Sequence, residues 1–434
     1  MQKLVKYWFS ITLFVAFAIR FVLSFFAHHI DLFNHSDWGI RFWQYGPAKF
    51  FSPDANVWSF TWPNQPPGTI YIFAGIRKLY EGIFNALSYL HFQLRVFPGS
   101  ILLYLEKNFY TALLKLPAIL ADFGIAWLVY KIVLEITKKK KLARIGAVVW
   151  LFNPAVWYNS AVWGQYDAVI NFLAMLAFYL LFKKKLLAAF LLLLFSFYIK
   201  ASLLIFAPVF LLTAIRQKYS IKKWLLAVGV SLAAVGLVTI PFLRGEPFSW
   251  LYALYREKVF TDQLHVTTAN GFNLWGVIFG VKDSAVQISD SVKFLGVAYK
   301  HLSYIIYLIF YLPALWLVYK RQDLKSIAWA LAIAAFSSFM LLTNMHERYL
   351  YPLFPYFTVL VVAAPQLYAN YAGVTLINIL NLYNFWWVPF IPGLMDFMQA
   401  REGAALRVLS GINLALFLFL YLRFAKYNLV RKKV

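Results

Sequence analysis

Two separated stretches of the sequence carry side chains that suit chemistry on a phosphate-linked substrate. The first, His35-Ser36-Asp37-Trp38, follows the first long apolar segment, and the second, Asn344-Met345-His346-Glu347-Arg348-Tyr349, lies between two later ones. A carboxylate near the membrane surface can remove a proton from an attacking hydroxyl, and fixed cations can hold the charge of a departing phosphate. In this interpretation Asp37 is the base, His346 and Arg348 bind phosphate, and Glu347 orients these two cations.

Each of these residues also has an ordinary structural explanation. Asp37 can cap a short helix that begins at Trp38, because Ser-Asp before an apolar run is a helix-start signal. His346 can be a satisfied histidine at the membrane interface. Arg348 can pair with Glu347 or reach the lipid headgroups. The spacing of the residues leaves both explanations open.

The composition places the chain in the membrane. It has 434 residues, of which 62% are hydrophobic and 20% aromatic, and its mean hydropathy is +0.67. A soluble protein cannot hide so much apolar surface, so the bilayer is the expected solvent. The net charge of +24 does not indicate a nucleic-acid partner, because the basic residues lie in short loops between apolar runs. Without cysteine there is neither a disulfide nor a thiolate metal site.

Clusters of Lys and Arg between the apolar runs predict the topology. Lysine and arginine favour the cytoplasmic side, so the apolar runs between successive clusters are expected to pair, with both chain termini inside. The predicted fold class is an all-α polytopic membrane protein with about twelve transmembrane helices. Their approximate bounds are 8–27, 110–134, 143–163, 166–182, 186–200, 201–216, 224–243, 295–319, 326–343, 348–364, 366–388 and 406–425.

This topology makes residues 1–434 a single membrane domain with two large outer segments, 28–109 and 244–294. Within the first, the stretch from Thr69 to Leu90 is apolar but interrupted by charges near helical spacing, so we expect an amphipathic interfacial helix. Asp31 and Asp54 are expected to be solvated loop residues. No repeat of a solenoid or propeller type is evident.

Four acidic residues lie within or beside apolar helices: Asp37, Asp122, Asp167 and Glu347. Charges at that depth are costly and usually serve a site or a buried partner. Asp122 falls near the middle of its helix, and Lys115 lies on the same face. This pair is either a structural ion pair or part of a site. Lys200 interrupts an apolar run, which fits either snorkelling to the surface or a cation that faces a lipid phosphate.

Two outer turns carry polar and aromatic residues that can contact a sugar or an acceptor. The first, at a helix hairpin, can equally be a tight turn with a helix cap, and the second can equally anchor the chain at the interface. The candidate substrate-binding residues are Trp163, Gln165 and Asp167 in the first turn and Asn270, Asn273 and Trp275 in the second.

The chain resembles the C-type glycosyltransferase (GT-C) superfamily, closest to the mannosyl- and glucosyltransferase branch of asparagine-linked glycosylation and its prokaryotic relatives. The resemblance rests on five ordered stretches that together cover most of the chain. They are Ser36-Asp37 with Pro66-Pro67-Gly68, Leu116 to Asp122, Asn153-Pro154 with Trp163 to Asp167, Asn270 to Trp275, and His346 to Tyr349. The first loop has a single Asp where many relatives have an acidic pair, and the last motif lacks the second His of the eukaryotic enzymes.

The resemblance implies an inverting hexosyltransferase that moves mannose or glucose from a polyprenyl-phosphate carrier to a glycan acceptor on the outer or lumenal face. It implies a multi-pass protein of the plasma membrane in a prokaryote, or of the endoplasmic reticulum membrane in a eukaryote. The sequence contains no recognisable metal, P-loop or dinucleotide motif, so we expect no cofactor. A lipid-glycan flippase or transporter, or a glycan polymerase or ligase of similar topology, is the alternative.

Overall fold

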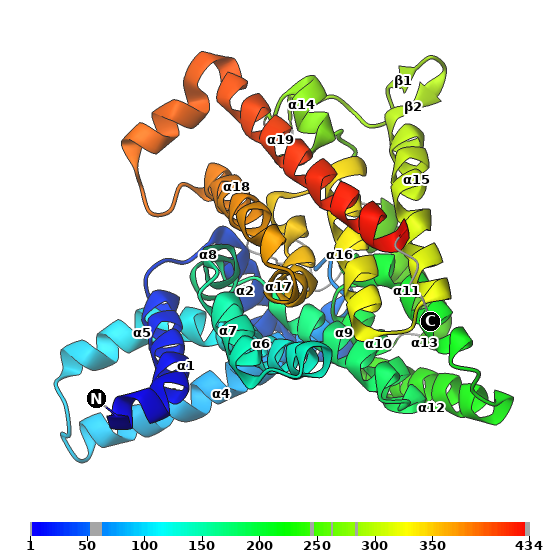
Figure 1. The fold of residues 1–434 in the computed structure, drawn as a ribbon. Helices are drawn as coiled ribbons and strands as arrows, with labels where there is room; N and C mark the ends of the chain where they lie inside the picture. The colour runs from blue at the N-terminus through cyan, green and yellow to red at the C-terminus, as the bar shows by residue number, and fades with distance from the viewer. Residues whose placement is uncertain (1, 53–62, 244–246, 262–263, 283–284, 430–434) are drawn as a thin grey trace.

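The computed structural model describes residues 2–52, 63–243, 247–261, 264–282 and 285–429, and helices dominate these ranges (Figure 1). The α-helices are α1 (Gln2–Ser24), α2 (Ile30–Tyr45), α3 (Pro47–Phe50), α4 (Pro67–Phe92), α5 (Gly99–Leu114), α6 (Leu116–Thr137), α7 (Lys140–Leu151), α8 (Pro154–Trp157), α9 (Asp167–Phe182), α10 (Leu186–Ile199), α11 (Ala207–Arg216), α12 (Ile221–Thr239), α13 (Pro247–Leu254), α14 (Leu274–Phe279), α15 (Tyr299–Lys320), α16 (Leu324–Leu341), α17 (Leu353–Ala363), α18 (Tyr368–Trp386) and α19 (Pro392–Leu429). Short 3₁₀ or π segments join some of them: η2 (Tyr158–Trp163), η3 (Ala201–Phe206), η4 (Ile240–Phe242), η5 (Tyr255–Thr261), η6 (Glu347–Leu350) and η7 (Pro365–Leu367). One short hairpin pairs β1 (Lys293–Phe294) with β2 (Val297–Ala298).

The protein is an all-α polytopic membrane protein, as the sequence predicts. Among the described residues, five helices are long and apolar enough to cross a membrane: Tyr7–Ser24, Ile221–Phe242, Tyr299–Lys320, Leu324–Leu341 and Gly403–Leu429. The α5–α6 pair, bent by 41°, counts as a sixth if it forms one broken span. Every segment predicted to span contains helix, but α9, α10 and the η3–α11 segment are shorter apolar helices that do not reach this length.

The central helix of the bundle is α16. Its span is 94% buried, whereas the span of α1 at the margin is only 17% buried. Small residues recur along α16 from Ala328 to Ser338 and allow neighbouring helices to approach closely. Such close packing favours helix association in a bilayer, where the hydrophobic effect does not drive it. Helices α15, α17 and α19 pack around it.

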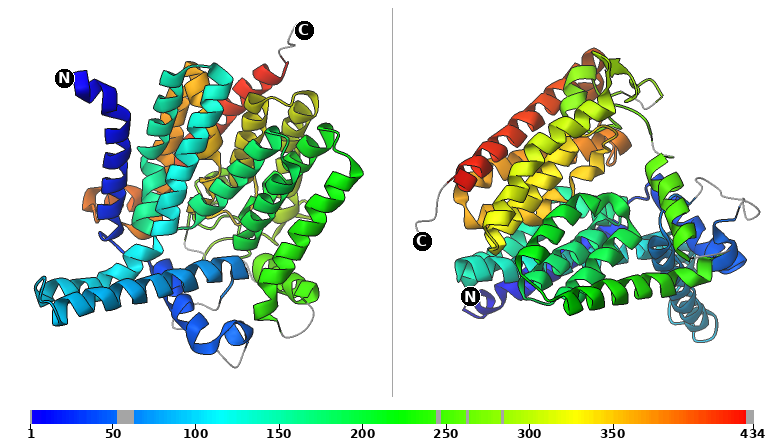
Figure 2. Two further views of the ribbon diagram at one scale, coloured as in Figure 1. Left: turned by 90° about the horizontal axis from the view of Figure 1, so that it is seen from below. Right: turned by 90° about the vertical axis from the view of Figure 1, so that its right-hand side faces the viewer.

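The first outer segment lies across the bundle. Helix α4 runs across the spanning helices, and α4 and α5 project sideways past α1 (Figure 2, left). The expected interfacial helix is therefore present, from Pro67 to Phe92. Its first turn packs against the end of α10, where a Cβ on Gly68 would lie 2.6 Å from the Tyr198 carbonyl oxygen. Only glycine fits at this position, which explains why Gly68 follows Pro66 and Pro67.

The second outer segment is joined to the loop after α16 by backbone pairing. Ala269 N donates to Met345 O at 3.1 Å, and Asn344 N donates to Val266 O at 3.0 Å. These bonds fix residues 344–348 against the segment that precedes α14. The basic turns that follow α6, α9, α11 and α15 lie at the opposite end of the bundle, together with the start of α1 and the end of α19 (Figure 2, left). This arrangement agrees with the expected bias of positive charge to one side.

Candidate functional site

Five charged side chains gather where the outer ends of several helices meet, and we call them the outer cluster. Asp31 comes from the first turn of α2, Asp167 from the first turn of α9, Lys200 from the junction of α10 and η3, and Glu347 and Arg348 from η6. These segments lie far apart in the sequence, so tertiary packing alone creates the cluster.

Asp31 is held by neighbours from three segments. Gln165 Nε2 and Trp163 Nε1 both donate to Asp31 Oδ2, the latter over 3.2 Å, and His29 Nδ1 lies 3.3 Å from the same oxygen. Burial alone disfavours the Asp31 carboxylate, but hydrogen bonding with His29 and the charge of Arg348 hold its pKa well below the ordinary value. The expectation that Asp31 is a solvated loop residue is therefore wrong.

Asp37 lies on a different face of α2 from the buried stripe. Both of its carboxylate oxygens accept from Arg41 Nε, at 2.9 and 2.8 Å, and both side chains are largely buried. The helix begins at Ile30, so Asp37 sits inside it and does not cap a helix that starts at Trp38. The acid whose charge acts on Arg348 is Asp31, whereas the ion pair of Asp37 is with Arg41.

Glu347 and Arg348 form a second pair within the outer cluster. Arg348 Nη1 lies 2.6 Å from Glu347 Oε1, and the Glu347 side chain is fully buried. The guanidinium carbon also lies 5.6 Å from the Tyr349 ring centroid. Burial disfavours the Arg348 cation, but Glu347 and Asp31 outweigh it and raise the pKa above its ordinary value. Arg348 therefore stays charged and is not free to snorkel.

Lys200 and Asp167 complete the cluster. Lys200 Nζ donates to Asp167 Oδ1 at 2.8 Å and lies 5.8 Å from the Tyr349 ring centroid. Its cation is turned into the protein, so snorkelling to the lipid surface does not describe it. Asp167 is the first residue of α9 and does not act as its cap.

A cavity of about 120 Å³ opens beside these pairs. Its lining residues include Asp167, Ser202, Met345 and Tyr349. Two of the lining residues have a buried polar atom without a hydrogen-bond partner among the described residues, Asp167 Oδ2 and Ser202 Oγ. Elsewhere in the outer cluster, Glu347 Oε2 and Arg348 Nε are likewise buried and unpartnered. Because an unsatisfied buried polar atom costs about 1–3 kcal/mol, such a set calls for a polar ligand or water.

Two histidines beside the cluster are uncharged. His35 is buried against the Phe73 ring at a centroid distance of 4.4 Å, and His346 packs on Tyr349 at 5.0 Å. Burial lowers the pKa of each to about 3, and the charges of Lys200 and Arg348 add to the effect. A neutral His346 can still donate a hydrogen bond, so its role in phosphate binding stays a prediction. With both histidines neutral, the outer cluster contains three carboxylates and two cations.

Asp122 belongs to a separate network inside the bundle. Arg20 Nε donates to its Oδ2 at 3.0 Å, Ser160 Oγ to the same oxygen at 2.6 Å, and Tyr351 OH to Oδ1 at 2.9 Å. The partner is Arg20 rather than Lys115, which instead donates to the Ser24 and Ala27 carbonyl oxygens at the end of α1. Arg20 is an ionisable residue inside the first apolar segment, and this position was the sequence signal that could have identified it.

The turn before α9 positions the Asp31 ligands. Trp163 ends the π-segment η2 and is fully buried, stacked on His29 at a centroid distance of 4.3 Å. Gly164 follows with φ +89°, and a Cβ there would lie 2.7 Å from Leu32. The expected tight turn is present, but α9 has no side-chain cap. Trp163 and Gln165 donate to Asp31.

Asn270, Asn273 and Trp275 tie the second outer segment to the bundle. Asn273 Oδ1 accepts from Gly276 N at 3.1 Å as the cap of α14, and Trp275 Nε1 donates to Leu341 O at 3.0 Å. Asn270 O accepts from Asn381 Nδ2 at 2.6 Å. These contacts hold the backbone that pairs with His346, so their role in the structure is scaffolding. Within the described ranges no three His, Asp or Glu side chains are grouped so that they could hold a metal ion.

Comparison with known families gives one match. Residues 72–271 match the model of the family described as GPI transamidase subunit PIG-U. The match covers a little under half of the chain and includes Trp163, Gln165, Asp167 and Lys200. No curated protein matches the chain.

This match corrects the prediction of an enzyme. The matching family is described as a subunit of a transamidase, so the assignment as an inverting hexosyltransferase is wrong. The coarser part of the GT-C resemblance stands, because the chain is a multi-pass helical membrane protein. The lipid-linked donor, the glycan acceptor and the flippase alternative remain predictions.

Proposed function

We propose that this chain is a glycolipid-binding subunit of a membrane complex. In this proposal the outer cluster holds the glycan headgroup of a lipid-linked glycan, and a partner protein carries out the chemistry on it. The observation that carries the proposal is the set of buried, unpartnered polar atoms in the outer cluster, where Asp167 also lines the cavity next to Tyr349.

The chemistry of those atoms favours a hydroxyl-rich ligand over a phosphate. Asp167 Oδ2 and Glu347 Oε2 can accept hydrogen bonds, whereas Arg348 Nε can donate one. A sugar hydroxyl both donates and accepts, so a glycan can satisfy all three atoms. A phosphate would meet two cations that already pair with carboxylates, at Lys200–Asp167 and Arg348–Glu347.

The family match supports the same class of ligand. A glycosylphosphatidylinositol (GPI) carries a glycan on a lipid, and the name of the matching family describes a subunit that works with other proteins. Lys200 and Asp167, two members of the outer cluster, lie inside the matched segment. A lipid tail in the bilayer would present its headgroup at the outer ends of the helices.

Binding of a synthetic GPI-type glycolipid to the full-length protein in nanodiscs tests the proposal. Phosphatidylinositol, which lacks the glycan, is the reference lipid. The wild type should retain the glycolipid over phosphatidylinositol, and Asp167→Asn should weaken that preference about tenfold or more, because a hydrogen bond to a charged group contributes about 1.5–3 kcal/mol.

Glu81→Gln is the matched control. Glu81 pairs with Arg77 at 2.9 Å on α4, away from the outer cluster, so its loss removes a charge without touching the cavity. Binding should then stay at the wild-type level. Equal retention of the two lipids by the wild type, or full retention by Asp167→Asn, would refute the proposal.

A further inference from the structure

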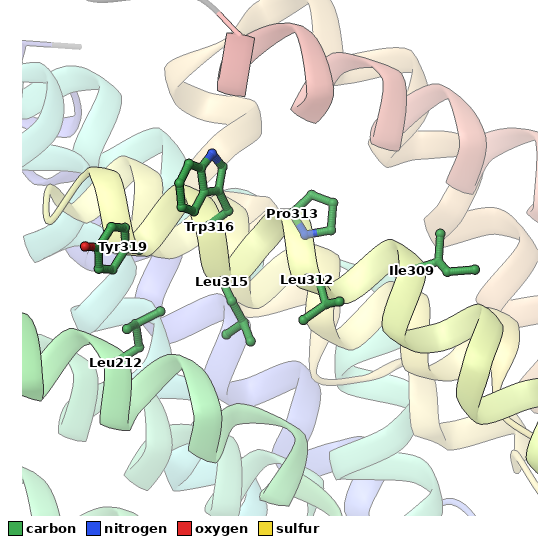
Figure 3. Close-up of a pocket in the computed structure, with 7 residues that line it drawn as sticks. All are labelled: Leu212, Ile309, Leu312, Pro313, Leu315, Trp316 and Tyr319. Carbon is green, nitrogen blue, oxygen red and sulfur yellow. The ribbon is translucent and has the colours of Figure 1, made fainter.

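A second cavity lies on the membrane-facing side of α15, at the other end of the molecule from the outer cluster. It has a volume of about 630 Å³, within the range of about 300–1,000 Å³ typical of ligand sites. We call it the α11–α15 groove, and it is lined by Leu212, Ile309, Leu312, Pro313, Leu315, Trp316 and Tyr319 (Figure 3). Six of these residues come from α15 and one from α11.

The groove follows from the way α15 packs. Its buried residues, such as Tyr311, Ala314 and Val318, face the rest of the bundle. Ile309, Leu312 and Trp316 recur at helical spacing on the opposite face and are exposed. The groove is thus an apolar channel that runs along one helix and opens toward the bilayer.

Two cations are held at one end of the groove by the aromatic residues that line it. The Arg216 guanidinium carbon lies 4.6 Å from the Tyr319 ring centroid, and Lys320 Nζ lies 4.4 Å from the Trp316 ring centroid. Each cation is the last residue of its helix, Arg216 of α11 and Lys320 of α15. Neither pairs with a carboxylate in the part of the chain that the structure describes.

This end of the groove is the basic end of the bundle. The turn after α11 contributes Lys218 and the start of α12 contributes Lys222 and Lys223. The turn after α15 contributes Arg321 and the start of α16 contributes Lys325. Anionic headgroups of the cytoplasmic leaflet attract basic side chains at about 1 kcal/mol for each Lys or Arg near the surface. The local charge therefore matches an anionic lipid of the inner leaflet.

We infer that the α11–α15 groove binds an anionic phospholipid, with one acyl chain along Ile309, Leu312 and Trp316 and its phosphate between Arg216 and Lys320. The apolar wall fits a hydrocarbon chain, and the two unpaired cations fit one anionic headgroup. A transmembrane helix of another protein would cover the wall but leave both cations without a counter-charge. This site is independent of the glycolipid proposal, because it uses other residues at the opposite end of the helices.

Native mass spectrometry of the full-length protein released from nanodiscs tests the inference. The nanodiscs contain equal amounts of phosphatidylglycerol and phosphatidylcholine, which share acyl chains and differ in net charge. The wild type should retain phosphatidylglycerol preferentially. Arg216→Gln and Lys320→Gln should each lower that preference about fivefold, the equivalent of about 1 kcal/mol.

Arg423→Gln is the matched control. Arg423 also lies at the basic end and over an aromatic ring, 4.9 Å from the Phe419 centroid, but outside the groove. Its substitution should leave the preference unchanged. Leu312→Trp, at an exposed position, should fill the groove and lower retention of phosphatidylglycerol with every cation still present.

Three results would overturn the inference. One is equal retention of the two lipids by the wild type. Another is a loss in Arg423→Gln as large as in Arg216→Gln, which would indicate a general effect of charge. The third is a photoreactive residue at position 312 that crosslinks to a protein helix instead of to lipid.

Discussion

Two networks of buried charge in the protein differ in how completely their charged atoms are satisfied. In the Asp122 network, Arg20, Ser160 and Tyr351 supply donors to both carboxylate oxygens. In the outer cluster, Asp167 Oδ2, Glu347 Oε2 and Arg348 Nε remain unpartnered.

The difference indicates two roles. The Asp122 network joins α1, α6, η2 and the segment after η6, so its hydrogen bonds hold helices together in a medium where few other polar contacts are available. One Arg20 nitrogen, Nη2, is left without a partner there. Asp167 of the outer cluster lines a cavity, and the cluster keeps both donors and acceptors open, as expected of a binding site. Burial of charge alone therefore does not distinguish structure from function, whereas satisfaction of its hydrogen bonds does.

The largest effect is expected from breaking the Asp122 network. Arg20→Met leaves the Asp122 carboxylate buried without its cation, which should lower the free energy of unfolding by about 3–5 kcal/mol. Thermal unfolding in detergent measures the loss. The double variant Arg20→Met/Asp122→Leu should recover much of it, because an apolar pair of similar volume needs no counter-charge. A double variant as unstable as the single one would contradict this interpretation.

A smaller effect is expected from a conservative change in the outer cluster. Arg348→Lys keeps the charge next to Glu347 but loses the planar donor set, so binding of the GPI-type glycolipid should weaken about tenfold. The melting temperature should change little. Titration of the glycolipid onto the protein in nanodiscs measures the affinity. If stability collapses while affinity per folded molecule is unchanged, Arg348 is structural like Arg20.

The third effect is a pH dependence that arises from His35. Burial lowers its pKa from 6.5 to about 3 in the folded protein, while Asp31 opposes the shift and Lys200, His29 and Arg348 contribute further to it. Between these two values the unfolded chain binds more protons than the folded one, so stability falls as the pH drops below about 6.5.

One such histidine should remove about 1 kcal/mol between pH 7 and 5.5, and His346 should act in the same direction. The melting temperature of the wild type should therefore fall over this range, and that of His35→Gln should fall by less. An identical pH dependence in the two proteins would show that His35 does not contribute.

The smallest effect is expected at Asp37. Its pair with Arg41 lies within one helix at four-residue spacing and outside the outer cluster. Asp37→Asn should cost less than about 1 kcal/mol of stability and leave glycolipid affinity unchanged. A loss of affinity as large as that of Asp167→Asn would show that Asp37 belongs to the binding site, and that Asp37 and Asp167 do not differ in role.

Sequence patterns predicted the elements better than they predicted which side chains meet. Apolar runs and basic turns identified the helical segments because both signals are local. The choice between Asp31 and Asp37 depended on the phase of α2. Residues Leu32, His35, Trp38 and Phe42 form its buried stripe, and Asp31 lies one helical turn before His35. The spacing is visible in the sequence. It was missed because the helix was expected to begin at Trp38, which leaves Asp31 outside it.

Other features of the site had no local signal. The Arg20–Asp122 pair joins residues from separate helices, and several residues of suitable charge were available to Asp122. The loss of positive charge on His346 arises from burial beside Arg348, which only the folded structure produces. The order of the five motifs led to the prediction of an enzyme. Residues of these motifs also hold the fold together, as Asn273 and Trp275 do through their hydrogen bonds to the backbone of α16.

Photocrosslinking tests the central claim most directly. A GPI-type glycolipid with a photoreactive group on its glycan is bound to the protein in nanodiscs, activated by light, and the labelled peptides are identified by mass spectrometry. The account predicts labels on the cavity-lining segments around Asp167, Ser202 and Tyr349, and their loss on addition of unlabelled glycolipid. Labels confined to the α11–α15 groove, or no competable label at all, would contradict it.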